Sequence, residues 1–369
     1  MSSPAGSPIP NERAESGVAE VRLTRRSMLG RLGLTAVAGA GVAAFPGTNG
    51  PAAAGAMSHE EMGHGEVHAH GGADGPVLRG GEAFDPAKAN GFDPDTFLRD
   101  FDWGRTSRLP DGRTLREWEI NAVDREIEIA DGVTFPAWTY DGQVPGRTLR
   151  CNAGDRLRIH FGNGSAHPHT MHFHGIHTAE MDGVPGIGAG LIEPGERTVY
   201  EFDAEPFGLH IFHCHAAPLA EHIARGMYGT LIIDPPGGRP KADEMVMVQG
   251  GWNTTLDGQG NQFYFVNGIP FHYMYHPVRV RKDDLIRVYL TNLLEYDPVN
   301  SFHLHANFFR FFPTGTSLDP VEFTDTISQV QGQRAVLEMK FPFPGKYMFH
   351  AHKSEFAELG WMGFFEVVE

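Results

Sequence analysis

Residues 213–229 read HCHAAPLAEHIARGMYG and residues 350–363 read HAHKSEFAELGWMG, so a His-x-His pair followed by Gly-x-x-Gly occurs twice in the same order. An earlier pair also recurs, as HFH at 172–174 and HLH at 303–305. Short alternating segments such as 156–161 (RLRIHF) precede these pairs, with Pro-Gly and Asn-Gly turns between them. The repetition predicts an all-β protein containing two β-sandwich domains of the same type.

Breakers and composition changes set the expected domain boundaries. The sequence PPGG after residue 234 ends the first strand-rich region, so we expect a first domain at 113–236 and a second at 244–369. We expect residues 57–112 to form a flexible, His/Met-rich linker and a lead-in. Residues 1–56 are then expected to be a signal region.

The N-terminus has the pattern of an export signal. Arg25 and Arg26 precede an apolar run, residues 32–45, which is too short as a helix (~21 Å) to cross a ~30 Å hydrocarbon core. With the sequence AAAGA at 52–56, this resembles a bacterial twin-arginine signal, although a disordered basic tail is the alternative. We therefore expect an exported protein (periplasmic, cell-surface or secreted) with no membrane span in the mature chain. The tract 57–74 either binds copper loosely or is a plain linker.

Composition excludes several classes of function. Lys and Arg total 30 against 46 Asp and Glu, for a net charge of −16, which argues against nucleic acid as a partner. Cys151 and Cys214 are the only cysteines, so a disulfide framework is excluded. The chain has 20 histidines, and their positions indicate the chemistry.

Four His-x-His pairs indicate a cluster of metal ions. Side chains alternate along a strand, so both imidazoles of each pair lie on one face. The eight predicted ligands are His172, His174, His213, His215, His303, His305, His350 and His352. This many imidazoles suits several ions with few protein ligands each. Copper fits best on the Irving–Williams order, whereas zinc more usually has an isolated site with three or four ligands.

Cys214 points away from the faces of its histidine neighbours and indicates a second kind of site. By the same alternation, His169 shares the face of the cysteine if the strand is unbroken. His222 and Met227 follow Cys214 across a loop. Two histidines, a thiolate and a methionine form the ligand set of a blue copper electron-transfer site. We predict a mononuclear copper here, joined to the cluster through the peptide bonds on either side of Cys214.

The second domain lacks an equivalent mononuclear site. Asn300 occupies the position of His169, Ala351 that of Cys214 and Trp361 that of Met227. The intervening segment is shorter and holds no histidine. Each chain therefore carries one mononuclear site and one full set of cluster ligands.

These motifs, HTMHFHG (169–175), HCH…H…M (213–227), FHLH (302–305) and HAH (350–352), together resemble those of the multicopper oxidases. The likeness is to the two-domain, laccase-like kind with its blue copper in the first domain. It implies cupredoxin-like Greek-key sandwiches and about four coppers per chain: one type 1, one type 2 and two type 3.

The resemblance also implies roles and an assembly. His172 and His303 would hold the type 2 copper and the other six cluster histidines the type 3 pair. Such proteins are homotrimers, with each trinuclear cluster formed between the first domain of one subunit and the second domain of the next. Electrons from a small reducing substrate, either a phenol, an aromatic amine or a metal ion, would then reduce O2 to water.

Two carboxylates are candidates for handling the protons of this reaction. Asp182 looks like the acidic residue that these oxidases place beside the cluster, and an ordinary Asp-Gly turn is its alternative interpretation. Glu355, three residues after His352, is a second candidate. Either carboxylate could hydrogen-bond a bound water.

Two other functions remain open. Copper nitrite reductase is also a trimer of paired sandwiches and shares the set His169, Cys214, His222 and Met227. That family has an aspartate at the position of His172, and its single type 2 copper would leave several imidazoles unused. A periplasmic copper-binding or electron-transfer protein would explain Cys214, but not four paired histidines. The sequence does not identify the reducing substrate.

Overall fold

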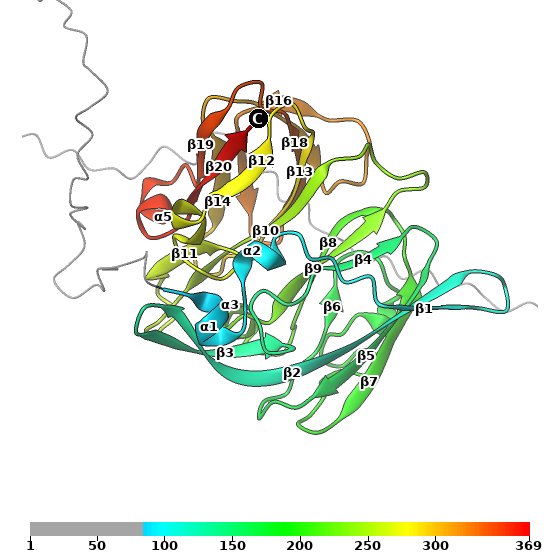
Figure 1. The fold of residues 1–369 in the computed structure, drawn as a ribbon. Helices are drawn as coiled ribbons and strands as arrows, with labels where there is room; N and C mark the ends of the chain where they lie inside the picture. The colour runs from blue at the N-terminus through cyan, green and yellow to red at the C-terminus, as the bar shows by residue number, and fades with distance from the viewer. Residues whose placement is uncertain (1–83) are drawn as a thin grey trace, which may run out of the picture. The chain divides into compact units, whose positions relative to one another are not determined.

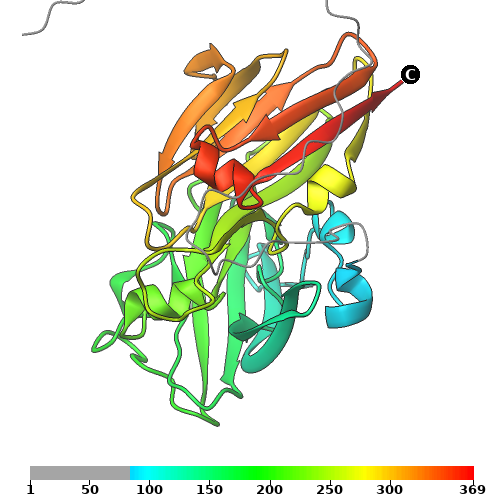
Figure 2. The ribbon, with the colours of Figure 1, turned by 90° about the vertical axis from the view of Figure 1, so that its left-hand side faces the viewer.

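A computed structural model describes residues 84–369, in which two β-sandwiches follow one another along the chain (Figures 1 and 2). In the first, a five-stranded sheet of order β1-β2-β5-β7, with β3 paired to β2, accompanies a four-stranded sheet of order β4-β9-β8-β6. Its strands are β1 (Arg105–Arg108), β2 (Thr114–Ala130), β3 (Val133–Tyr140), β4 (Leu149–Asn152), β5 (Arg156–Asn163), β6 (His172–Phe173), β7 (Arg197–Asp203), β8 (Gly208–His213) and β9 (Tyr228–Asp234). The 3-10 turn η1 (Ala179–Met181) and helix α3 (Leu219–Ala224) connect them.

The second sandwich pairs a six-stranded sheet, β11-β10-β13-β18-β15-β16, with a five-stranded sheet, β12-β20-β19-β14-β17. Its strands are β10 (Asp243–Trp252), β11 (Phe263–Val266), β12 (Val278–Arg281), β13 (Ile286–Asn292), β14 (Val299–Leu304), β15 (Phe309–Pro313), β16 (Glu322–Thr324), β17 (Thr326–Val330), β18 (Arg334–Met339), β19 (Gly345–His350) and β20 (Met362–Val368). Helices α4 (His272–Tyr275) and α5 (Ser354–Glu358) lie in its loops. The predicted all-β, cupredoxin-like fold is confirmed.

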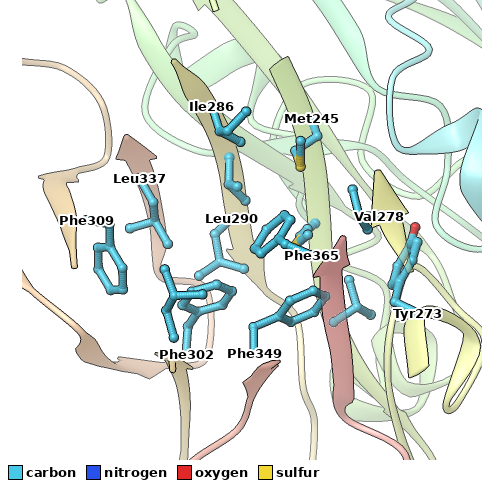
Figure 3. Close-up of a cluster of buried hydrophobic side chains, with 14 of the residues drawn as sticks. Met245, Tyr273, Val278, Ile286, Leu290, Phe302, Phe309, Leu337, Phe349 and Phe365 are labelled. Carbon is cyan, nitrogen blue, oxygen red and sulfur yellow. The ribbon is translucent and has the colours of Figure 1, made fainter. Parts of the chain in front are cut away.

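The core of each sandwich lies between its two sheets. In the second, Ile286, Leu290 and Leu337 of one sheet meet Phe302, Phe349 and Phe365 of the other (Figure 3). Residues of both sheets form the equivalent cluster of the first sandwich. A third cluster takes buried side chains from both domains, Ile211 and Val246 among them, so the sandwiches share a hydrophobic contact.

The described part of the expected lead-in is folded. Two short helices, α1 (Pro86–Asn90) and α2 (Pro94–Phe97), each begin after an aspartate whose side chain accepts a backbone N–H, a capping pattern visible in the sequence as Asp-Pro. Pro94 accepts a hydrogen bond from Tyr273 of the second sandwich at 2.8 Å. The lead-in therefore packs against the second domain, which the sequence analysis did not predict.

Residues 1–83, which include the expected twin-arginine signal and the His/Met tract, lie outside the described residues. Within residues 84–369 no helix has the length and apolar character needed to cross a bilayer.

Glu244, on β10, forms ion pairs with an arginine of each sandwich. Arg150 of β4 in the first domain approaches Glu244 Oε2 at 2.7 Å, and Arg287 of β13 in the second approaches Oε1 at 2.8 Å. Tyr289 donates to the same Oε1 at 2.9 Å. Burial alone would raise the pKa of Glu244, but the hydrogen bonds and charges of the two arginines hold it below its usual range.

Replacing this carboxylate is expected to be costly. Glu244→Gln leaves the Arg287 guanidinium, 1% exposed, without one of its two carboxylate partners, so we expect a loss of about 3–5 kcal/mol of unfolding free energy. Glu366→Gln, which removes the partner of the exposed Arg279, is the matched control and should cost less than about 1 kcal/mol. Chemical denaturation of both variants checks this. Equal, small losses would show that the buried network does not hold the domains together.

Candidate metal centre

Three elements of the first sandwich bring together Cys214, His169 and His222. Cys214 follows β8, His169 lies in the loop before β6, and His222 lies in α3. The Cys214 Sγ is 3.2 Å from His222 Nδ1 and 3.7 Å from His169 Nδ1, and the two Nδ1 atoms are 3.2 Å apart. All three side chains are buried. One sulfur and two nitrogen atoms thus converge on one small volume.

The electrostatics of this pocket suit a soft cation. Burial raises the pKa of the Cys214 thiol, although N–H groups of Thr170 and Ala216 point at its sulfur from 3.4 and 3.5 Å. Burial lowers the pKa of His169 to about 3 and that of His222 to about 4, so both imidazoles are neutral at pH 7. A bound cation would stabilise the thiolate and accept the nitrogen lone pairs.

Outer contacts fix the orientation of this set. His169 Nε2 lies 2.9 Å from Ser165 Oγ, which donates to Asp124 Oδ1 at 2.6 Å, so the Nδ1 lone pair of His169 is directed toward Cys214. The carbonyl of Met227 accepts the Cys214 N–H at 2.9 Å, and the Met227 N–H donates to the His222 carbonyl at 3.1 Å. The structure therefore brings all four predicted residues into one buried region.

The histidine pairs of the first domain meet across the β6–β8 pairing. His172 lies opposite His213 in the register. His174 Nε2 and His213 Nε2 face each other at 2.9 Å, and the ring of His215 lies 5.4 Å from that of His172. These four residues form the first half-set.

The histidines of the second domain have the same arrangement, with nearly the same distances. His303 lies opposite His350 in the β14–β19 pairing. His305 Nε2 and His350 Nε2 are also 2.9 Å apart, and the ring of His352 lies 5.2 Å from that of His303. These four residues form the second half-set. The sequence repeat is therefore a repeat of ligand geometry.

Backbone carbonyls orient the imidazoles in both half-sets. An Nδ1–H that donates to a carbonyl leaves the Nε2 lone pair free for a metal. Four such contacts are present: His172 Nδ1 to Asp182 O at 2.8 Å, His213 to Cys214 O at 2.8 Å, His303 to Asp325 O at 3.1 Å and His350 to Ala351 O at 2.6 Å. Burial also lowers the pKa of His174 to about 3 and of His213 to about 4. These two imidazoles are thus neutral nitrogen donors at pH 7.

Asp182 lies directly behind the first half-set. Its Oδ1 is 3.0 Å from His172 Nδ1 and 3.4 Å from His177 Nε2. Gly183 makes this approach possible, because its φ of 68° is left-handed and a Cβ there would overlap the carbonyl oxygen of Met171. Asp182 ends the 3-10 turn η1 and at the same time lies beside the histidines. His177, three residues after His174, was assigned no role from the sequence, because it has no matched partner in the second domain.

Glu355 lies in α5 with its side chain 59% exposed, and its Oε2 is 3.3 Å from the Nζ of Lys353. No contact found among the described residues joins it to a histidine. Its role in proton transfer stays a prediction.

The second domain keeps the frame of the Cys214 site but not its donors. The Ala351 N–H donates to Trp361 O at 3.2 Å and the Trp361 N–H to Phe356 O at 2.8 Å, as in the first domain. Phe356 thus occupies the place of His222 and stacks on Tyr264 at 3.9 Å between ring centroids. Side chains that cannot bind copper fill this position.

Comparison with known families decides the identity of the fold. A family model described as multicopper oxidase matches residues 121–238, and a second of the same description matches residues 242–369. This chain belongs to the multicopper oxidase family. The resemblance stated from the motifs is confirmed.

Relatives of this multicopper oxidase include both oxidases and nitrite reductases. A crystal structure of a multicopper oxidase is 64% identical, with a TM-score of 0.75, and the match covers 76% of this chain and 99% of that one. The blue copper oxidase of Nitrosomonas europaea is 28% identical, with a TM-score of 0.63, covering 69% and 86%. The copper-containing nitrite reductase of Neisseria meningitidis is 30% identical over 254 residues, which span 63% of this chain and 64% of the relative.

The depressed histidine pKa values predict acid sensitivity of the copper-free multicopper oxidase. His169 and His174 titrate near 3 and His213 and His222 near 4 when folded, but near 6.5 when unfolded. Between pH 6.5 and 4 the unfolded chain therefore binds more protons, so stability falls as the pH falls. We expect the melting temperature to drop on the order of 10 °C from pH 7 to 5.

Differential scanning calorimetry of the copper-free and copper-loaded forms checks this. The copper-loaded form should melt at a higher temperature at each pH, because copper binds only the folded state. Its melting temperature should also fall with the pH, because its bound histidines take up protons only when the chain unfolds. A melting temperature of the copper-free form that is constant over this range contradicts the assignment of neutral, desolvated histidines.

Proposed function

We propose that this protein is a laccase-like oxidase that takes single electrons from a reducing substrate and reduces O2 to water. The observation that supports this most is the completeness of the two half-sets. All eight imidazoles are present, and in each half-set two Nε2 atoms face each other at 2.9 Å. A protein with a single catalytic copper has no use for so many oriented donors.

The donor sets suit about four coppers per chain. We assign the type 1 copper to His169, Cys214, His222 and Met227, the type 2 copper to His172 and His303, and the type 3 pair to His174, His213, His215, His305, His350 and His352. When bound, copper supplies the one-electron redox chemistry and the binding site for O2. The chain contributes the connection: Cys214 is bonded through its two peptide groups to His213 and His215, so the two donor sets share a covalent path.

A homotrimer would complete the cluster. In both half-sets the triads whose donor atoms lie within 4.8 Å of one another come from a single domain, so one chain presents two half-sites. His305 is exposed, and near it Phe308 is 48% exposed and packs against Phe323, 67% exposed, at 5.4 Å. An apolar surface beside an unfinished site suits coverage by the first domain of another subunit.

The reducing substrate would donate electrons beside His222. A cavity of about 620 Å³ lies there, and its wall includes Trp138, whose ring is 4.7 Å from that of His222. The Arg225 guanidinium lies over Trp138 at 4.5 Å. The carboxylates on this wall are Asp124, Glu126 and Glu221. We propose a phenol, an aromatic amine or a metal ion as the donor, and export through the twin-arginine pattern at Arg25 and Arg26.

Copper nitrite reductase is the second candidate, because the matching relatives include such enzymes. The presence of His172, with its ring set beside those of the first half-set, argues against it. A copper-binding electron-transfer protein is the third candidate.

Copper content with optical and EPR spectra separates the three. About four coppers per chain, a strong blue band, a type 2 signal and a near-ultraviolet shoulder, together with O2 consumption, support the oxidase. About two coppers, no shoulder and nitrite turnover would establish the nitrite reductase instead. A single blue copper without turnover would leave the electron-transfer protein.

A further inference from the structure

A cavity of about 470 Å³ opens at the first half-set, and residues of both sandwiches line it. His172, His174, His213 and His215 form one part of its wall. Glu295, Gln331 and Gly332 of the second sandwich form another part. Glu295, to which the sequence motifs assign no role, thus shares a cavity with four proposed copper ligands.

Two turns of the second sandwich place Glu295 there. Glu295 lies just after β13, and Gln331 lies in the turn between β17 and β18. The Gln331 amide donates a hydrogen bond to Glu295 Oε1. The next residue, Gly332, lies against the half-set, since a Cβ there would be 3.7 Å from His174 Cε1. Glu295 is therefore hydrogen-bonded to the residue next to Gly332, which lies beside a ligand imidazole.

The surroundings of Glu295 contain no direct counter-charge among the described residues. Its side-chain partner is the neutral amide of Gln331. The titratable and charged groups around it include the four cavity histidines and Tyr296, which is next in sequence. They also include Glu221 of α3 and Arg225 just after α3, both near Tyr296, together with Asp297, and Arg334 near His174. Burial raises the pKa of Glu295 to about 7. The group can therefore hold and release a proton near neutral pH.

We propose that Glu295 is the residue that donates protons to oxygen during O2 reduction in this cavity. This inference rests on the proposed oxidase function. Each turnover uses four electrons from the reducing substrate and four protons, and it converts one O2 to two waters. The protonated Glu295 side chain releases a proton into the cavity, which has room for bridging water. The resulting carboxylate then takes up a proton from solvent.

This placement differs from that of Asp182. Asp182 contacts the Nδ1 side of His172, behind the half-set, and holds the orientation of the ring. Glu295 lies in the cavity onto which the half-set opens. The two carboxylates therefore have separate tasks, one positioning a ligand and the other supplying protons.

The test compares Glu295→Gln, Glu295→Asp and Glu193→Gln, an exposed glutamate outside the cavity, as copper-loaded proteins. We expect Glu295→Gln to lower O2 turnover about 10- to 100-fold, because a positioned acid typically contributes such factors. Turnover of the unchanged protein should decline as the pH rises through about 7. This decline should be absent in Glu295→Gln, shifted in Glu295→Asp and unchanged in Glu193→Gln. Anaerobic reduction of the blue copper by substrate should stay unchanged in all three.

Infrared spectroscopy of the copper-free and copper-loaded forms gives a second readout. We expect a protonated-carboxyl band that titrates near neutral pH and is missing in Glu295→Gln. Turnover and a pH profile that are unchanged in Glu295→Gln, while the parent protein consumes O2, would overturn the proposal and leave the oxidase function standing. A parent protein with its full copper content that consumes no O2 would overturn both.

Discussion

Replacing Cys214 with serine is expected to abolish the blue absorption and to lower oxidase turnover at least about 1,000-fold, because the hydroxyl is a hard ligand that does not stabilise Cu(I). The copper content should fall from about four to about three per chain, since the half-sets do not use the sulfur. Optical spectra, copper analysis and O2 consumption together measure these effects. The type 2 EPR signal should persist.

Cys151→Ser provides the matched control. Cys151 lies on β4, is buried, and its Sγ lies 3.7 Å from the carbonyl oxygen of Ile232. Burial raises its pKa, and it belongs to none of the groups within residues 84–369 that could hold a metal ion. We expect Cys151→Ser to keep the blue colour and the turnover. Loss of colour in both variants would indicate general destabilisation, and colour retained in Cys214→Ser would contradict the assigned site.

Mixing two inactive variants is expected to restore oxidase turnover if each cluster is formed by two subunits. His174→Ala damages the first half-set and His305→Ala the second, so each variant alone should have less than about 1% of the parent turnover. If each cluster joins the first domain of one subunit to the second domain of the next, random 1:1 trimers of the two variants contain intact clusters at about a quarter of the interfaces. Mixing after subunit dissociation should therefore restore about a quarter of the parent turnover.

A mixture of His174→Ala with His213→Ala is the control for this experiment. Both variants are damaged in the first half-set, so no arrangement of subunits yields an intact cluster. Activity in the first mixture and none in the control supports a shared site. If subunit exchange is shown by native mass spectrometry and both mixtures stay inactive, the cluster lies within one chain.

Much of the site could be predicted because strand alternation is a local rule. In each His-x-His pair the first histidine lies on a strand and the second just beyond the end of that strand. The leading histidines of the two pairs in each domain lie opposite each other across a strand pairing. The two halves also agree in their backbone contacts, with the His215 N–H donating to Thr170 Oγ1 and the His352 N–H to Ser301 Oγ. A repeat in sequence was therefore a reliable guide to a repeat in geometry.

His169 lies close to Cys214 as expected, but not for the expected reason. We expected it to share the face of Cys214 if its strand were unbroken, but β6 spans only His172–Phe173. His169 instead lies in the loop before β6 and pairs with Ile192 through an isolated bridge. Its imidazole reaches Cys214 because a backbone pairing and the contact with Ser165 hold it there.

Glu295 could not be predicted, because its neighbours are distant in sequence. Its approach to the first half-set depends on the β17–β18 turn, which carries Gln331 and Gly332, and on the packing of one sandwich against the other. No periodicity in the chain encodes such a meeting. The folded lead-in, by contrast, carried recognisable capping signals at Asp85 and Asp93.

In the second sandwich aromatic side chains replace the copper ligands of the first, and this has a consequence for the direction of electron transfer. In the second sandwich Phe356 and Trp361 stand where the first carries His222 and Met227, and both are fully buried. With coppers bound as proposed, an electron could therefore reach the cluster from a mononuclear copper in the first sandwich only. Because the second sandwich lacks these donors, each catalytic unit would receive electrons from one side only and would pass them on only to O2, which becomes water.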